Sequence, residues 1–440
     1  MAGERRSLVL GKVCTKIGSG ATPRGGKEAY RGGETALIRS QNVHNDHFAH
    51  NGLAYIDDAQ ADELRNVVVE RDDVLLNITG DSVARCCQVV PDVLPARVNQ
   101  HVAIIRPKAD VLNPRFLRYS LVNSPMQSHL MALASAGATR NAITKSMIEG
   151  LVVEAPPIEE QRAIAHILGT LDDKIEILRR QNETLEAMAR ALFKAWFVDF
   201  EPVRTKMGGR WRRGESLPGM PAELWERFPD RLVESELGEI PEGWEAGRLG
   251  DVAEHPRRSL QPDTIEPSLP YIALEHMPRR CISLFDWGVA EGLESNKFEF
   301  KKGDVLFGKL RPYFHKVGVA PIDGVCSTDI VVMTARCPEW FGLVLSHASS
   351  DEFVEYTNAG STGTKMPRTS WTDMARYEIV LPPKFVAEAF TALTGPWIER
   401  IIAAIHESRT LAQLRDTLLP KLISGELRVP NFTQQLEEMA

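Results

Sequence analysis

The 440-residue sequence contains no apolar run long enough to cross a membrane. A transmembrane helix needs about 20 consecutive apolar residues, and polar or charged side chains interrupt every hydrophobic stretch before that length. The opening residues, "MAGERR", are not followed by the long apolar segment of a secretory signal. We therefore expect a cytoplasmic protein with no membrane partner. A hydrophobic content of 43% over this length allows two or three globular domains.

Cysteine is scarce, and none of the six cysteines forms a C-x-x-C pair. A zinc site or a disulfide framework is therefore not expected. The histidines His44, His47 and His50 have a spacing that could suit a metal ion, but only Asp46 accompanies them. We expect these histidines to lie in a loop without a metal.

The common catalytic motifs are also missing. The chain has no G-x-x-x-x-G-K-[ST] phosphate loop, no H-E-x-x-H and no G-x-S-x-G. It has no Asn-Pro-Pro-aromatic stretch of the kind that holds an extruded adenine, because "APP" (155–157) and "LPP" (381–383) place no amide before the prolines. We therefore expect no catalysis by this chain.

An excess of positive charge is missing as well. The net charge is −7. Residues 1–157 carry 18 Lys and Arg against 16 Asp and Glu, whereas residues 236–384 carry 16 against 22. Binding to a polyanion would therefore depend on local basic clusters rather than on the overall charge.

Three sequence patterns are present twice, in the same order. They are "RDDVLLN" (71–77) with "KGDVLFG" (302–308), "VAII" (102–105) with "IVVM" (330–333), and "EAPPIEEQRAI" (154–164) with "VLPPKFVAEAF" (380–390). The offsets are 231 from Asp73 to Asp304, 228 from Val102 to Ile330 and 226 from Pro156 to Pro382. Three ordered matches at nearly one offset predict a tandem duplication.

Each copy begins with a globular segment that is rich in short β-branched runs bounded by Gly, Pro and Asp. Examples are "DVLLNIT" (73–79), "VAIIRP" (102–107) and "DIVVMT" (329–334), which are typical of strands in a sheet with many loops. Helical stretches at 113–134 and 338–359 each begin at a proline, a common first-turn residue. The sequence therefore predicts two mixed α+β segments.

A long amphipathic helix follows each globular segment. Apolar residues recur at alternating spacings of four and three, which indicates a coiled-coil seam. The first seam consists of Ile164, Leu168, Leu171, Ile175, Leu178, Asn182, Leu185, Ala189, Leu192 and Trp196. The second consists of Phe390, Leu393, Trp397, Ile401, Ala404, Ser408, Leu411, Arg415, Leu418 and Leu422. A helix of forty residues is about 60 Å long. We expect the two helices to pack antiparallel, with Asn182 fixing their register. The alternative is that each helix is buried in one large core.

Five stretches carry a resemblance to a known family. They are "GSGATPRGG" (18–26), "PPIEEQRAIAHILGTLDDKIE" (156–176), "ALFKAWFVDFEPV" (191–203), "FPDRLVESELGEIPEGW" (228–244) and "LLPKLISGEL" (418–427). In this order, and over the whole chain, they resemble the specificity (S) subunits of type I restriction-modification systems. The second copy departs from the family pattern at 381–390, which lacks the counterpart of Glu160-Gln161, and at 251–259.

The resemblance implies an α+β fold with two target recognition domains separated by two long antiparallel coiled-coil helices, related by a pseudo-two-fold axis. The expected segments are a first recognition domain (1–157), a first helix (158–200), a linker (201–235), a second recognition domain (236–384), a second helix (385–425) and a tail (426–440). Each domain would read one half of a bipartite, asymmetric target in double-stranded DNA, and the helices would set the spacer. The partners would be two methylation (M) subunits and restriction (R) subunits, which would hold S-adenosylmethionine, ATP and Mg.

Polar and basic loop residues are the expected DNA contacts. Gln and Asn can hydrogen-bond adenine at two points, Arg can do the same with guanine, and glycine-rich loops let amides approach phosphates. In the first domain these residues are Arg39, Ser40, Gln41, Asn42, Asn99, Gln100, Thr139, Arg140 and Lys145. In the second they are Lys309, Arg311, Tyr313, Thr362, Lys365 and Arg368, of which the first three would face one way on a strand. Each could instead belong to a solvated polar loop.

Two further segments have open roles. The aromatic residues Phe193, Trp196, Phe197 and Phe200 are expected either to dock an M subunit or to pack at the junction of the helix and the domains. The basic run at 204–214 is expected to be a solvated tether, because glycines and prolines surround it. A coiled-coil scaffold with protein-binding heads is the alternative function, and a fused restriction-methylation enzyme is disfavoured by the missing catalytic motifs.

Overall fold

The computed structural model describes residues 4–23, 30, 32–135, 141–361 and 366–429. The chain forms two compact units, Met1–Glu176 with Leu411–Ala440 and Ile177–Thr410. Two long helices, α6 (Ile158–Phe193) and α12 (Lys384–Ser424), contribute residues to both units. The division between the units therefore falls inside the helices and not at their ends. No helix in the described ranges is long and apolar enough to cross a membrane.

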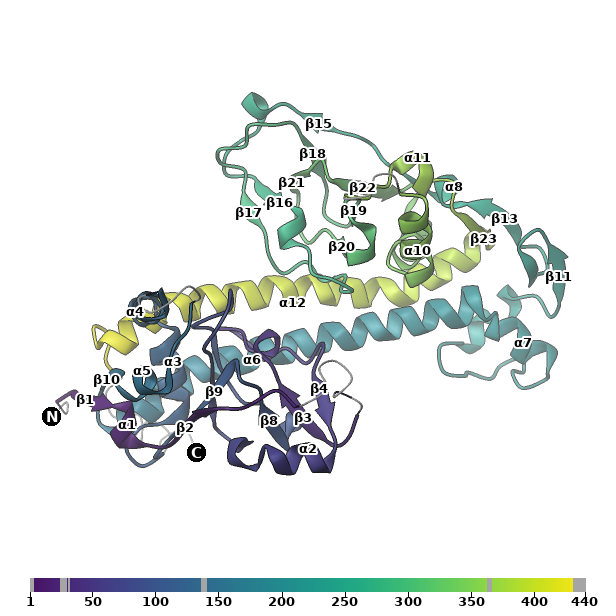
Figure 1. The fold of residues 1–440 in the computed structure, drawn as a ribbon. Coiled ribbons are helices and arrows are strands. Elements are labelled where there is room, and N and C mark those ends of the chain that lie inside the picture. The colour runs from purple at the N-terminus through teal and green to yellow at the C-terminus, as the bar shows by residue number, and fades with distance from the viewer. Residues whose placement is uncertain (1–3, 24–29, 31, 136–140, 362–365, 430–440) are drawn as a thin grey trace. The chain divides into compact units, whose positions relative to one another are not determined.

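The first unit contains two four-stranded sheets (Figure 1). The strand order of one is β2 (Cys14–Ser19), β9 (Val102–Pro107), β6 (Val74–Asn77) and β7 (Cys86–Gln88), with all neighbours antiparallel. The order of the other is β4 (Ala54–Ile56), β3 (Thr35–Ile38), β8 (Ala96–Val98) and β5 (Val68–Val69), with β3 and β8 parallel. A separate pair joins β1 (Arg6–Val9) to β10 (Val152–Ala155). The shorter helices are α1 (Leu10–Val13), α2 (Asp58–Glu63), α3 (Pro114–Val122), α4 (Ser124–Ser135) and α5 (Lys145–Glu149).

The second unit repeats this sheet topology with one additional edge strand, β15 (Ser259–Leu260), in its second sheet. One sheet has the order β14 (Ala253–Glu254), β22 (Ile330–Ala335), β19 (Val305–Gly308) and β20 (Val317–Val319). The other has the order β15 (Ser259–Leu260), β18 (Lys297–Phe300), β21 (Gly324–Ser327), β16 (Pro270–Ile272) and β17 (Gly288–Val289), with β16 and β21 parallel. Two further pairs join β13 (Glu245–Arg248) to β23 (Glu378–Leu381) and β11 (Leu232–Ser235) to β12 (Gly238–Pro241). The shorter helices are α7 (Glu201–Met207), α8 (Leu249–Val252), α9 (Phe341–Ala348), α10 (Asp351–Ala359) and α11 (Trp371–Met374).

The offsets predicted from the sequence match equivalent strands of the two units. β19 begins 231 residues after β6, β22 begins 228 after β9, and β23 begins 226 after β10. The buried aspartates play the same part in both turns, because Asp73 accepts a hydrogen bond from the Glu70 amide (2.7 Å) and Asp304 one from the Lys301 amide (2.8 Å). Each repeated aspartate therefore holds the tight turn that leads into a central strand.

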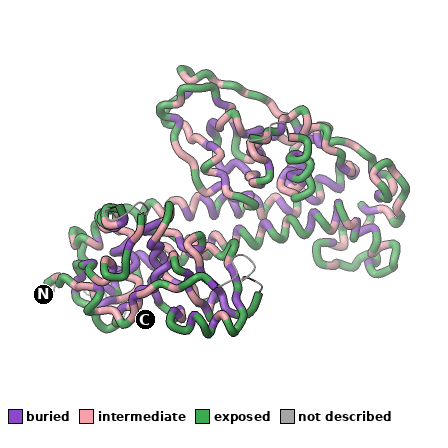
Figure 2. The backbone as a smooth tube through the Cα atoms, viewed as in Figure 1, coloured by how far each residue is buried: buried purple, intermediate pink, exposed green. Residues whose placement is uncertain are grey.

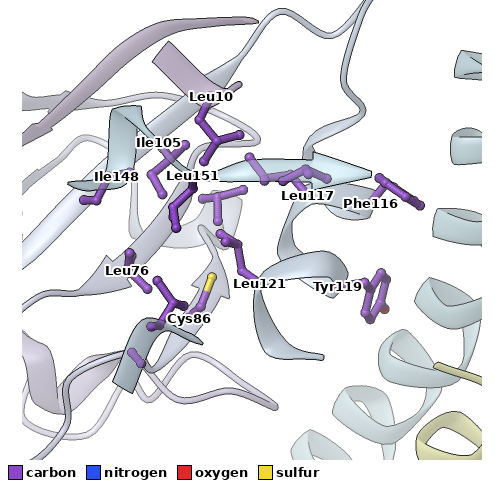
Figure 3. Close-up of a cluster of buried hydrophobic side chains, with 14 of the residues drawn as sticks. Leu10, Leu76, Cys86, Ile105, Phe116, Leu117, Tyr119, Leu121, Ile148 and Leu151 are labelled. Atoms are coloured by element: carbon purple, nitrogen blue, oxygen red, sulfur yellow. The ribbon is translucent and has the colours of Figure 1, made fainter. Parts of the chain in front are cut away.

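The cores form because the apolar side chains of these strands meet one face of the short helices. Figure 3 shows the main cluster of the first unit, where Leu76 of β6 and Ile105 of β9 meet Leu117 and Leu121 of α3. In the second unit Phe307 of β19 meets Phe353 of α10, with ring centroids 5.6 Å apart. The broken helical segments α3/α4 and α9/α10 correspond to the continuous stretches expected at 113–134 and 338–359.

The long helices pair antiparallel within the second unit. Asn182 of α6 donates from Nδ2 to the carbonyl of Ile401 in α12 (3.5 Å), and the ring of Phe193 lies 6.4 Å from that of Phe390. A later residue of α6 thus contacts an earlier residue of α12, which means that the two helices run in opposite directions. In the first unit Arg415 of α12 donates to Asp172 of α6 (2.8 Å). Figure 2 shows buried and exposed residues alternating along both helices. All the predicted seam residues are buried or half-buried.

The segment after α6 is packed, not a solvated tether. A short π-helical turn (Lys194–Val198) ends α6, and Phe200 adopts a left-handed conformation (φ 52°) that turns the chain into α7. Trp211 is then only 1% exposed, in a cluster with Trp196, Phe228 and Trp244. The expectation of a tether is corrected because the glycines and prolines bend this segment back onto the aromatic end of α6.

Candidate nucleic-acid interface

The same three-segment junction is present in each unit. In the first junction (residues 78–79, 99–101 and 142–143), the Ile78 amide donates to the carbonyl of His101 (3.0 Å) and the Ile143 amide donates to that of Ile78 (2.8 Å). In the second junction (residues 309–310, 327–329 and 368–369), the equivalent bonds run from Lys309 to Asp329 (2.9 Å) and from Thr369 to Lys309 (3.1 Å). Isolated bridges, Thr79 with Ala142 and Leu310 with Arg368, close both arrangements. Thus the duplicated backbone brings together the same three loops twice.

The side chains of the first junction form a chain of hydrogen bonds. Thr22 donates from its hydroxyl to Oε1 of Gln100, and Gln100 Nε2 lies 3.1 Å from Nε2 of His101. The other ring nitrogen of His101, Nδ1, lies 2.5 Å from Oγ1 of Thr79. Gln100 is itself exposed. This junction presents a positioned amide to solvent.

The side chains of the second junction are charged. Arg368 Nη2 lies 2.9 Å from Asp329 Oδ1, and both side chains are partly exposed. Burial lowers the pKa of Lys309, Asp329 opposes this effect, and the nearby charges of Arg368 and Arg257 add to it. Lys309 thus has two further cations and one carboxylate near it, which makes this junction a local basic cluster within an acidic unit.

The predicted residues at 39–42 divide into exposed and buried ones. Gln41 is exposed and donates to the Gly52 carbonyl (3.1 Å), which also accepts a hydrogen bond from Arg39. The half-buried Ser40 accepts at its carbonyl from Asn77 Nδ2 (2.9 Å). Asn42 is 0% exposed, with its Oδ1 accepting from the Arg39 amide (3.0 Å) and its Nδ2 donating to the Ala49 carbonyl (2.8 Å).

The prediction of base contacts is therefore revised for two residues. Both ends of the Asn42 side-chain amide form hydrogen bonds with the backbone of its own loop. Asn99 is 5% exposed, and its Oδ1 accepts from the His101 amide (3.0 Å). Both side chains hold the loops in place instead of facing solvent.

The prediction of a strand at 308–316 is corrected. β19 ends at Gly308, and a 3-10 turn (Pro312–Phe314) follows, flanked by left-handed conformations at Arg311 (φ 52°) and His315 (φ 51°). Lys309, Arg311 and Tyr313 therefore do not alternate on one face of a strand. Tyr313 is 50% exposed at the tip of this turn.

The remaining predicted contacts fall into two groups. Lys145 is the first residue of α5, is exposed, and lies 3.5 Å from Glu149. Thr139, Arg140, Thr362 and Lys365 lie outside the described residues.

The aromatic residues expected to dock a partner are buried. Phe193, Trp196, Phe197 and Phe200 are between 1% and 6% exposed. The ring of Trp196 lies 5.0 Å from that of Phe228, and Phe197 lies 5.0 Å from Phe390. Of the two roles open to them, the structure assigns internal packing. The docking role is not supported, because these side chains are almost fully buried.

Several junction residues were not predicted. They are Thr22, Thr79, His101, Arg257 and Asp329. The repeat itself could have found three of them, because Thr79 and His101 stand at the same offsets from Leu310 and Asp329 as the matched strands that flank them. For metals, the part of the chain that the structure describes holds no group of three His, Cys, Asp or Glu side chains that could bind an ion.

Comparison with known proteins identifies a matching domain model and similar full-length proteins. Residues 8–187 match the model of the Type I restriction modification DNA specificity domain. The MjaIX specificity subunit of Methanocaldococcus jannaschii is 27% identical over 430 residues, covering 94% of this chain and 91% of that protein. The HindI specificity subunit of Haemophilus influenzae is 25% identical over 436 residues, covering 89% and 94%.

A solved structure shares the fold. The S subunit of a type I restriction-modification system from M. genitalium aligns with a TM-score of 0.53 at 13% identity, covering 96% of both chains. This chain, with two copies of one topology, thus has the fold of that S subunit. Residues 8–187 carry the type I specificity domain, and nearly the whole chain is similar to the specificity subunits of type I restriction enzymes. The matched model spans the first copy, whereas the two relatives align over both copies.

Proposed function

We propose that this specificity subunit reads a bipartite, asymmetric target in double-stranded DNA, with one half read by each unit. The observation that carries the proposal is the pair of junctions: the same backbone hydrogen bonds present different side chains in the two units. A shared scaffold lets both units approach a duplex in the same manner, whereas different side chains give each unit its own base preference. An asymmetric target follows.

The long helices would set the spacer between the half-sites as an antiparallel coiled coil. α6 has 36 residues and α12 has 41, so they are about 54 Å and about 62 Å long at 1.5 Å per residue. Either length exceeds one turn of duplex DNA, about 34 Å. The buried Asn182 supports a fixed register, since a seam amide is satisfied in only one alignment.

The chain would act without catalysis of its own, in a complex with two M subunits and with R subunits. Those partners would hold S-adenosylmethionine, ATP and Mg. The helices are the proposed docking elements for the M subunits, although not through the aromatic cluster at the end of α6, which is consumed by internal packing. The alternative of a protein-binding scaffold is not favoured, because it gives no reason for a basic cluster and a positioned amide at equivalent junctions.

The experiment that tests this proposal uses the full chain co-expressed with its M partner in a host free of other DNA methylation. We expect sequencing of methylated positions to show one bipartite target of two unlike half-sites at fixed separation. A purified complex should also retard a duplex carrying that target more strongly than a scrambled one. Absence of methylation and of retardation would contradict DNA recognition and would favour the scaffold.

A further inference from the structure

We infer that the two junctions read different base chemistry: the first junction recognises an adenine in its half-site through Gln100, and the second recognises a guanine through Arg368. This inference rests on the proposed function and adds to it the residue and the base class at each half-site. In each junction, the fold uses some hydrogen-bonding groups of the reading side chain and leaves others available to a base.

Gln100 has a donor and an acceptor left over. A glutamine amide offers two N–H donors and two lone pairs. Its Oε1 accepts from Thr22, and its Nε2 faces Nε2 of His101 at 3.1 Å. When the amide donates to this nitrogen, Nδ1 of His101 carries the ring proton and donates to Thr79. One N–H and one lone pair of Gln100 then remain.

This remaining pair fits one base. Adenine presents an acceptor (N7) next to a donor (N6) in the major groove, and a glutamine amide pairs with both. The hydrogen bonds to Thr22 and His101 hold the amide plane in one orientation. The side chain therefore loses less rotamer freedom when it binds.

Arg368 is held in a similar way, but by an ion pair. Its Nη2 lies 2.9 Å from Asp329 Oδ1, and Asp329 is in turn fixed because its amide donates to Oγ of Ser327 (3.2 Å). One contact to the carboxylate leaves the other guanidinium donors available, and the forked pair of an arginine matches O6 and N7 of guanine. Arg257 and Arg368 both lie close enough to Lys309 for their charges to lower its pKa further, beyond the effect of burial, so the three cations add positive potential at this point.

The backbone of both junctions is held in place before any ligand binds. Arg368 is flanked by the bridge to Leu310 and by the hydrogen bond from the Thr369 amide to Lys309 (3.1 Å). Gln100 precedes His101, whose carbonyl accepts from Ile78 (3.0 Å). A reading residue needs such support, because a loosely held side chain gives little discrimination between bases.

The test compares variants of the co-expressed complex by the bases tolerated at each position of the methylated target. For Arg368→Ala and Arg368→Lys we expect discrimination at one guanine of one half-site to fall by about 5- to 150-fold, the range of one bidentate pair, with the other half-site unchanged. Arg368→Lys keeps the charge and loses the fork, so it should lose discrimination while keeping most of the affinity. Arg231→Ala is the matched control, since Arg231 is an exposed arginine that pairs with Glu242 on the β11–β12 hairpin.

In the first unit, Gln100→Ala should relax one adenine of the other half-site by a similar factor. Gln100→Glu has only acceptors and should move the preference from adenine towards cytosine, whose N4 is a donor. Gln88→Ala, in β7, is the control.

Two results would overturn the inference while leaving DNA recognition intact. In the first, Arg368→Ala weakens binding to all DNA sequences equally and reduces the slope of log affinity against log salt by about 0.9, which would make Arg368 a phosphate contact. The second is an unchanged half-site in both Gln100 variants. Loss of all methylation by the wild-type complex would instead contradict the proposed function.

Discussion

Asp172 of α6 is predicted to hold the first unit together, because it joins three segments of the chain. Its carboxylate accepts from Arg118 Nη1 (2.6 Å) and the Tyr119 hydroxyl (2.6 Å) of α3 and from Arg415 Nη1 (2.8 Å) of α12. The side chains of Arg118, Asp172 and Arg415 are only 7%, 13% and 13% exposed. Asp172→Asn would leave the buried Arg118 without its counter-ion and would leave Arg415 paired only with the exposed Asp416.

The expected cost follows from this burial. Breaking a buried ion pair by removing one partner destabilises a protein by about 3–5 kcal/mol, because an uncompensated charge stays behind. Burial alone raises the pKa of Asp172, but Arg118, Arg415 and the Tyr119 hydroxyl hold that pKa below its ordinary value. A carboxylate with a depressed pKa stabilises the fold above its unfolded pKa of about 3.9, and the contribution is lost as the pH falls through the lower, folded value. Asp172→Asn should therefore also flatten the acid limb of stability against pH.

The assay is urea unfolding of the purified chain, combined with hydrogen exchange at residues 411–424 to localise the effect. The neighbouring Asp173 provides a matched control, because it pairs with Arg115 but is 60% exposed. Exposed pairs contribute about 0–1 kcal/mol, so Asp173→Asn should change stability little. The reasoning would be refuted if the two variants lost equal stability, or if α12 residues 411–424 exchanged no faster in Asp172→Asn.

Two other predictions concern the second unit. Burial raises the pKa of Glu186, although hydrogen bonds from the Ser283 hydroxyl (2.6 Å) and the Ile282 amide (3.1 Å) oppose this effect. Because a raised carboxyl pKa favours the protonated form in the folded state, the stability of the fold should fall as the pH rises from about 4.3 towards the folded pKa. Glu186→Gln should remove this slope of stability against pH in urea titrations between about pH 4 and pH 8. A slope that persists in Glu186→Gln would show that another group causes it. Trp196→Ala should lower the free energy of unfolding by about 3–5 kcal/mol. Val198→Ala is the control and should change it little, because the Val198 side chain is 49% exposed. If Trp196→Ala left stability unchanged but abolished binding of the M subunit, the aromatic cluster would be a docking surface.

Much of the fold could be predicted from local patterns. The offset between Asp73 and Asp304 identified two equivalent turns because an aspartate that caps a tight turn is a local requirement, visible in a few residues. The seam periodicity likewise identified two long helices, whose observed bounds differ from the predicted ones mainly where the π-helical turn ends α6 early.

Other features depended on contacts that are distant in sequence. Nothing in "RTKMGGRWRRG" indicates that Trp211 packs with Phe228 and Trp244, so composition alone suggested a tether. Asn42 and Gln41 are neighbours of similar chemistry, yet only the fold decides which of them is buried. The left-handed residues Arg311 and His315 broke an expected strand, and Pro312 between them was the one local sign of that turn.

The central claim is that each unit reads its own half of the target, and exchange of one recognition segment tests it most directly. Residues 1–157 are replaced with the corresponding segment of another specificity subunit, and the methylated positions are sequenced in a host that supplies the M subunit. We expect one half-site to change and the other half-site to be retained. Changes in both half-sites, or in neither, would contradict it.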